Sequence, residues 1–244
     1  MSWYDQGEAG QEKARQDDEE RKRRASGIFR FWLPVDKSAQ FTFLDTAGFF
    51  FKEHQLYING SWMNFETCIQ DIGEEDCPPC EAGMKYSYVC VFTIVDHSEY
   101  VSKTTKKRVT NTKKLLVLKA TARNKILKQK ERREGDLTFC RYEATRFADK
   151  ECSTGEDFEF IQRYTLDEMQ AMAPSEWMGN PITPNEWLKP FDYMKLFNPK
   201  SAAELRRIIG MVQPVGSESS PFRGETSMGE DDAQEAPPDV SSLV

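Results

Sequence analysis

The sequence contains no long hydrophobic run. Its first twenty residues, MSWYDQGEAGQEKARQDDEE, lack the apolar stretch of a signal peptide, and no segment approaches the ~20 continuous apolar residues of a membrane span. We therefore expect a soluble protein of the cytoplasm with no membrane partner. In that reducing compartment the six cysteines are expected to be free thiols or metal ligands rather than disulfides.

Apolar residues are also scarce for a globular chain of 244 residues. Hydrophobic residues make up 39% of the sequence and charged residues 30%, a balance that disordered ends would explain. We expect a polar N-terminal arm over residues 1–27 and a disordered acidic tail over residues 215–244, which is rich in Gly, Ser, Pro and acids. The packed core then covers residues 28–214.

Clustered carboxylates, which nucleases and primases use to hold catalytic metal ions, are lacking in the middle of the chain. We therefore expect a protein that is not an enzyme, and a nuclease or primase fragment is the least favoured alternative. The acidic residues of this region lie scattered among cations, at Glu131, Glu134, Asp136, Glu143 and Asp149.

Positive and negative charges are separated along the chain, although the net charge is only -7. Residues 101–150 contain sixteen Lys and Arg against five Asp and Glu, a local charge of +11. Residues 216–244 contain seven acids and one arginine, a local charge of -6. The basic middle predicts a polyanionic ligand, and the acidic end predicts a segment that competes with that ligand or imitates it.

Short strand-like patterns with long polar connections favour a mainly β fold, a small barrel or sandwich. The clearest pattern is KYSYVCVFTIV, where alternation places Tyr86, Tyr88, Cys90, Phe92 and Ile94 on one face. Further strands are expected at IFRFWLP, on both sides of the hairpin signal Asn59-Gly60, and at KLLVLKATA, DLTFCRYEATRFA and DFEFIQRY. A few helices are expected only late, over about residues 165–214, where two capping-box spacings begin at Thr165 and Ser201.

One histidine and three cysteines share the segment HQLYINGSWMNFETCIQDIGEEDCPPC with the spacing H-x13-C-x8-C-x2-C. Cys3His is a standard ligand set for a structural zinc, and a C-x2-C turn presents two thiolates to one ion. The hairpin brings the remaining two ligands side by side. We therefore predict one structural Zn2+ per chain in a subdomain of about residues 52–84, held by His54, Cys68, Cys77 and Cys80.

Two other interpretations of these residues stay open. The cysteines could be small buried fillers beside a surface histidine, or Cys77 and Cys80 could form a thioredoxin-like redox pair. The redox motif opens a helix after a strand, whereas GEEDCPPCEAG resembles a loop. The three remaining cysteines are expected in the core, at Cys90, Cys140 and Cys152.

The basic connection YVSKTTKKRVTNTKK holds no acidic residue, and aromatic residues lie near it in the sequence. A basic groove lined by aromatic rings holds single strands by stacking bases, whereas duplex readers insert a helix into the major groove. A solvated loop and core aromatics are the alternatives. The candidate nucleic-acid-binding residues are Trp62, Tyr86, Tyr88, Lys103, Lys106, Lys107, Arg108, Lys113, Lys114, Lys119, Arg123 and Tyr142.

Taken in order, these motifs resemble a known family. Asn59-Gly60 with Trp62, Glu66-Thr67-Cys68, Cys77-Pro78-Pro79-Cys80 and the segment SYVCVFTIVD are similar to the single-stranded DNA-binding (helix-destabilising) proteins of T-even bacteriophages. The similarity covers roughly residues 28–165. It implies an OB-fold barrel with an inserted zinc subdomain, zinc on the ligands named above, and base contacts from Trp62 and Tyr88.

The resemblance also implies a role and partners. It implies a phage-encoded protein that coats and protects single-stranded DNA during replication, recombination and repair in the host cytoplasm. A basic segment such as Arg21–Arg24 would support self-association on DNA, and the acidic tail would recruit replication and recombination proteins. The alternative function is that of an RNA-binding or transcription-regulating zinc protein with the same surface.

Overall fold

The computed structural model describes most of the predicted core. It covers residues 29–58, 61–73, 76–101, 108–147, 153–177 and 180–210, together with residues 7, 10, 11 and 15, and only the backbone at residues 57–58 and 61–64. The acidic tail, the Arg21–Arg24 segment and most of the N-terminal arm lie outside the described residues.

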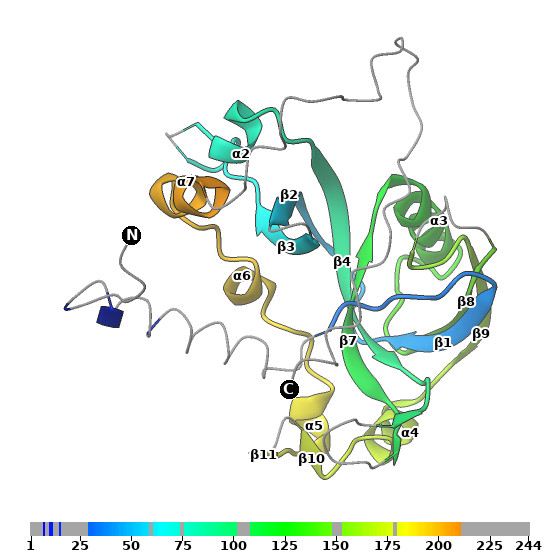
Figure 1. Cartoon of the computed structure of the whole chain (residues 1–244). Helices are drawn as coiled ribbons and strands as arrows, with labels where there is room; N and C mark the ends of the chain where they lie inside the picture. Colours follow the sequence, from blue (N-terminus) through cyan, green and yellow to red (C-terminus); the bar gives the residue numbers. More distant parts are fainter. Residues whose placement is uncertain are drawn as a thin grey trace.

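Seven strands of the described chain form one antiparallel sheet (Figure 1). Their order is β3-β2-β4-β1-β8-β9, and β7 pairs with the other edge of β4. Two short ribbons, β5 with β6 and β10 with β11, stand apart. The strands are β1 (Lys37–Phe43), β2 (Phe49–Ile58), β3 (Ser61–Thr67), β4 (Tyr86–Asp96), β5 (Tyr100–Val101), β6 (Arg108–Val109), β7 (Thr112–Leu118), β8 (Cys140–Arg146), β9 (Asp157–Arg163), β10 (Glu176–Trp177) and β11 (Asn180–Pro181).

The predicted alternation in β4 is confirmed. Cys90, Phe92 and Ile94 lie in the main core, which β1, β8 and helix α3 complete, whereas Val89 and Val91 face a second cluster on the opposite side. β4 pairs with β2 through residues 86–91 and with β1 through residues 94–96. One long strand therefore joins the hairpin β2–β3 to the rest of the sheet.

Helices in the described residues are mostly short, and none is long and apolar enough to cross a bilayer. The capping boxes predicted at Thr165 and Ser201 are both present, with Glu168 and Glu204 as the reciprocal partners. The helices are α2 (Pro78–Glu81), α3 (Ala120–Glu131), α4 (Leu166–Ala171), α5 (Pro184–Trp187), α6 (Tyr193–Leu196) and α7 (Ala202–Gly210).

Helix α3 corrects the prediction that helices occur only late and that KATA continues a strand. β7 ends at Leu118, and α3 begins two residues later after Lys119, whose side chain makes no cap hydrogen bond. Only Ala122 and Ile126 of this helix are buried. Because the helix lacks both a cap signal and a wide apolar face, its sequence carries little helical pattern.

The mainly β, antiparallel prediction is confirmed, but the described strands do not close a barrel. β7 and β9 are not paired with each other, and α3 contacts both of them as well as β4. The segment IFRFWLP also forms no strand: Arg30 makes a single parallel bridge to Leu115. The hairpin β2–β3 belongs to the main sheet, and Asn59-Gly60 at its predicted turn lies outside the described residues.

A C-terminal strap, defined as residues 184–210, crosses the sheet from α5 to α7. Phe191, Tyr193 and Phe197 pack over the face opposite the main core, where the Phe51 and Phe197 ring centroids are 4.5 Å apart. The strap ends in α7, which lies beside α2 (Figure 1). There Ala202 and Leu205 pack against Cys68 and Cys77. The strap therefore connects the sheet to α2 and the neighbouring cysteines.

Gly48 allows the close approach of the turn before β2 to the core. Its φ of +69° lies in the left-handed region, and an added Cβ would lie 2.8 Å from Cys90 Sγ and 2.9 Å from Phe92 Cζ. We expect Gly48→Ala to lower the free energy of unfolding in urea by roughly 2–4 kcal/mol, through strain and overpacking. Gly135→Ala is the control: φ is +83° but the space is open, so we expect a loss of only about 1 kcal/mol. Equal losses would contradict the packing argument.

Candidate metal centre and aromatic platform

Four predicted ligands converge at the base of the hairpin. His54, Cys68, Cys77 and Cys80 offer one nitrogen and three sulfurs that all lie within 4.8 Å of one another. Cys68 Sγ is 3.8 Å from Cys77 Sγ and 3.7 Å from Cys80 Sγ. His54 Nε2 is 3.5 Å from Cys77 Sγ and 3.4 Å from Cys80 Sγ.

These separations match a tetrahedral zinc site. With Zn–S near 2.3 Å and Zn–N near 2.0 Å, tetrahedral angles give sulfur–sulfur edges of about 3.8 Å and nitrogen–sulfur edges of about 3.5 Å. The four edges given above agree with these values, so the cluster could hold a metal ion and is consistent with zinc. A disulfide requires a sulfur–sulfur distance near 2.05 Å, so the thiols are not paired.

Local structure brings each ligand into place. The hairpin register sets His54 opposite Glu66, and the Cys68 amide donates to the Lys52 carbonyl, so both strands deliver a ligand to the same end. Cys77 caps a one-turn helix, α2, which corrects the predicted loop and places Cys80 on its last turn. His54 Nδ1 lies 3.1 Å from the Lys85 carbonyl. If Nδ1 donates this hydrogen bond, Nε2 is free to bind metal.

Without a bound metal ion, burial disfavours the charged forms of the ligand side chains, namely the cysteine thiolates and the histidine imidazolium. It raises the pKa of the Cys80 thiol to about 12 and also raises the pKa of Cys68. Burial lowers the pKa of the His54 imidazole. A metal ion that binds the Cys68 and Cys80 thiolates must therefore displace their thiol protons.

Neither Cys90 nor Cys140 is a ligand of this cluster. Cys90 and Cys140 are buried in the main core, which confirms their prediction as apolar fillers. Cys152 lies outside the described residues.

An aromatic platform, defined as Phe50, Tyr86 and Tyr88, adjoins the metal cluster. The three side chains are 39%, 46% and 50% exposed. Tyr86 and Tyr88 lie on the face of β4 that farther along the strand carries the core residues Cys90 and Phe92. Phe50 comes from β2, and its ring centroid lies 6.2 Å from that of Tyr88. The inward face of β4 therefore becomes an open surface at its N-terminal end.

Two cations flank the platform. Lys52 Nζ lies 4.6 Å from the Tyr86 ring and pairs with Asp71, a hydrogen bond that raises the pKa of the lysine. Arg123, from the first turn of α3, donates to the Tyr88 carbonyl at 2.8 Å, and its guanidinium lies 5.3 Å from the Tyr88 ring. The rings and cations thus combine stacking surface with positive charge.

No protein-family model, curated protein or solved structure matches the chain. The site must therefore be interpreted from its own geometry.

Two of the predicted nucleic-acid-binding residues are buried, which contradicts that role, and a third is held in an ion pair. Tyr142 is fully buried in the main core, because β8 alternates and its inward positions Cys140, Tyr142 and Ala144 pack there. Lys113 is buried against Trp177 and Phe191, with Nζ 5.0 Å and 4.7 Å from the two ring centroids. Lys114 is held 2.7 Å from the buried carboxylate of Asp96.

For several other candidate residues, binding to nucleic acid stays a prediction. Arg108 is 77% exposed and pairs with Glu99 at 3.1 Å, a surface contact that contributes little stability. Lys119 is half-buried just before α3. The side chains that lie outside the described set are Trp62, Lys103, Lys106 and Lys107.

Phe50 is the platform residue that sequence reasoning missed. The run Phe49, Phe50, Phe51 is uniformly apolar, so it does not show which ring faces away. Phe49 and Phe51 pack under the C-terminal strap. Strand alternation then leaves Phe50 on the face of Tyr88, which is the signal that could have identified it.

Burial of Lys113 predicts a pH dependence of stability. Burial lowers its pKa in the folded protein to about 8, from an ordinary value of 10.5. Between these two pH values the unfolded chain binds a proton that the folded chain does not, so the free energy of unfolding should rise with pH, by up to about 3 kcal/mol. Urea unfolding at pH 7.5 and pH 10 should show this rise, and Lys113→Met should lack it.

Other groups titrate in the same pH range, so the difference between two proteins is the informative quantity. Lys128, exposed on α3, provides the matched control. Lys128→Met should keep the wild-type rise, and an equal pH dependence in wild type and Lys113→Met would contradict the prediction.

Proposed function

We propose that the protein binds single-stranded DNA across the aromatic platform. The observation that carries the proposal is the exposure of Phe50, Tyr86 and Tyr88 on one face, beside Lys52 and Arg123. Stacking of a base on an aromatic ring contributes about 1–3 kcal/mol and tolerates any base. Adjacent cations contact phosphates and release counterions.

The arrangement of strands supports an OB-fold as the scaffold. β1 and β2 pair in succession with β4, β4 pairs with β7, and β8 and β9 continue from the other edge of β1. Helix α3 lies between β7 and β8 in sequence and contacts β7 and β9, the strands whose pairing would close the barrel. OB-folds are partly open five-stranded barrels that bind oligonucleotides on one face.

A metal ion at the cluster would also stabilise the aromatic platform. Zn2+ bound by the four ligands would supply structural cross-linking of β2 to the segment that leads into β4. Because His54 lies opposite Tyr86 in the β2–β4 register, a fixed His54 also fixes the start of the platform. The ligand set is closed, which favours a structural role over catalysis.

The proposed context is the one that the family resemblance implies. The protein would coat DNA during phage replication, recombination and repair, self-associate on the strand, and recruit other proteins through residues 216–244. RNA binding or transcriptional regulation is the alternative, because the 2′-hydroxyl alone separates the two ligands.

Tryptophan and tyrosine fluorescence during titration with poly(dT) and poly(rU) tests the proposal. We expect quenching by poly(dT) at low salt and a fall of log K with log salt at about -0.7 per phosphate contact. Tighter binding of poly(rU) would favour the alternative. The absence of binding to either polymer, with one zinc per chain in the same sample, would overturn the proposed function.

A further inference from the structure

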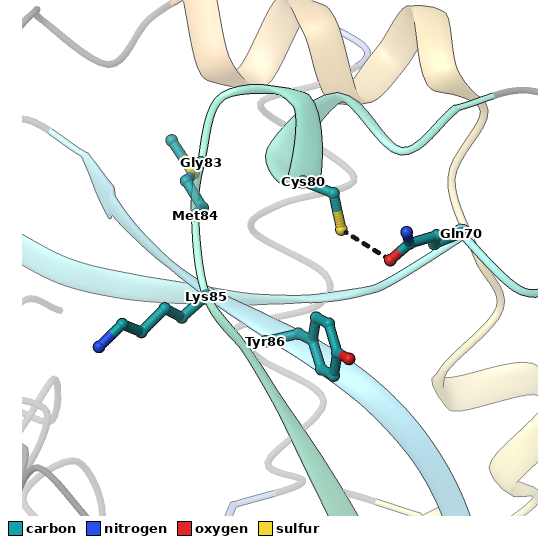
Figure 2. A pocket seen from close by; sticks show the side chains of 6 residues that line it. All are labelled: Gln70, Cys80, Gly83, Met84, Lys85 and Tyr86. Carbon is teal, nitrogen blue, oxygen red and sulfur yellow. Dashed lines mark hydrogen bonds between the residues drawn. The ribbon is translucent and has the colours of Figure 1, made fainter. Parts of the chain in front are cut away.

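The metal centre has one exposed side. A shallow hollow opens onto it, lined by Gln70, Cys80, Gly83, Met84, Lys85 and Tyr86 (Figure 2). Cys68 and Cys77 are buried, and neither lines this hollow. Cys80 is only partly buried, so it is the one sulfur of the cluster that a small solute can reach directly.

Gln70 lies over this sulfur. Cys80 Sγ is 3.3 Å from Gln70 Oε1, and Figure 2 shows the amide oxygen directed at the sulfur. A thiolate ligand cannot donate a hydrogen bond, so in a metal-bound cluster the amide would turn and donate through Nε2. A hydrogen bond of this kind lowers the nucleophilicity of a thiolate. The Gln70 side chain also restricts the approach of a solute to Cys80 Sγ.

The geometry points to Cys80 as an oxidation site through which peroxide opens the metal centre. The Cys80 thiolate attacks hydrogen peroxide, the O–O bond breaks, hydroxide leaves, and a sulfenic acid forms on Cys80. Cys68 Sγ lies 3.7 Å from Cys80 Sγ, close enough to attack. Its thiolate forms the S–S bond and displaces a second hydroxide, so two thiolates supply the two electrons that reduce the peroxide.

The disulfide would dismantle the site. It leaves His54 and Cys77 as the remaining ligands, too few for a closed tetrahedral centre. It also draws Cys68 toward Cys80, to a sulfur–sulfur distance near 2.05 Å. Because Cys68 packs against Ala202 and Leu205, the same reaction weakens the packing of α7 against the cluster. This inference does not depend on nucleic-acid binding.

Peroxide treatment of the zinc-loaded chain tests the proposal. The protein carries Cys152→Ala, and hydrogen peroxide is substoichiometric. Peptide mass spectrometry with dimedone should find the first sulfenic-acid adduct on Cys80. Without dimedone it should find a Cys68–Cys80 disulfide, with one zinc released per disulfide formed. A first adduct on Cys68 or Cys77, a Cys77–Cys80 disulfide, or zinc release without oxidation of Cys80 would each overturn the proposal.

Gln70→Ala provides a second test that leaves every ligand in place. Loss of one hydrogen bond and of the covering side chain should accelerate peroxide-dependent zinc release about 2- to 10-fold. Gln162→Ala, at an exposed glutamine on β9, is the matched control and should release zinc at the wild-type rate. Equal rates in Gln70→Ala and wild type would show that this opening is not the route to the sulfur.

Discussion

Replacement of Cys77 by serine should abolish metal binding and destabilise the fold more than any other single change proposed above. Zinc content should fall from about one per chain to near zero. Structural zinc sites bind with roughly 10 kcal/mol or more, and loss of even a third of this should lower the melting temperature by about 6–12 °C. Metal analysis and thermal unfolding of the same sample measure both effects.

Cys90→Ala is the control for this result. Cys90 is as deeply buried as Cys77 but belongs to the main core, so its truncation leaves only a small cavity. We expect full zinc content and a loss of about 1–2 kcal/mol. A Cys77→Ser protein that keeps one zinc per chain and the wild-type melting temperature would remove the metal centre from the description of this fold.

Tyr88→Ala should weaken binding to poly(dT) by about 5- to 100-fold, the range that corresponds to one stacked base. The salt dependence of binding should stay unchanged, because an uncharged ring releases no counterions from DNA. Arg123→Ala should act in the opposite way, with a shallower slope of log K against log salt. Fluorescence titration at several salt concentrations distinguishes the two effects.

Two controls make the stacking claim specific. Tyr88→Phe keeps the ring and should bind nearly as wild type does. Phe147→Ala removes a ring that is 57% exposed just after β8, a strand that does not pair with the platform strands β2 and β4, and should have little effect. If Phe147→Ala weakens binding as much as Tyr88→Ala, the platform is not the binding surface.

The four residues of the candidate metal cluster could be predicted from the sequence because their signal is local and chemically distinctive. All four candidate ligands fall within residues 54–80, and two of them form a C-x2-C pair, which is a common pattern for metal ligands. The residues on each face of β4 could be predicted equally well, since alternation along a strand assigns neighbouring side chains to opposite faces. Both predictions depend on neighbouring residues only.

The errors concern burial that distant residues create. Lys113 resembles its basic neighbours in sequence, but Trp177 and Phe191 of the C-terminal region cover it in the structure. Tyr142 lies among arginines in sequence, yet Phe41 and Phe43 pack on its ring. Pattern analysis identifies the face of a strand, and it cannot identify which remote segment covers that face.

The C-terminal strap has a consequence for the order in which the chain folds. The ligand sulfurs lie 9 and 12 residues apart in sequence, whereas the hydrogen bond from Thr67 to the Phe197 carbonyl spans 130 residues. Closing a short loop loses less chain entropy and is faster than closing a long one. During synthesis the segment that carries Cys68, Cys77 and Cys80 can therefore close before residues 184–210 of the strap have been added to the chain. With metal bound, the strap would dock last, onto a surface that the metal ion had already shaped.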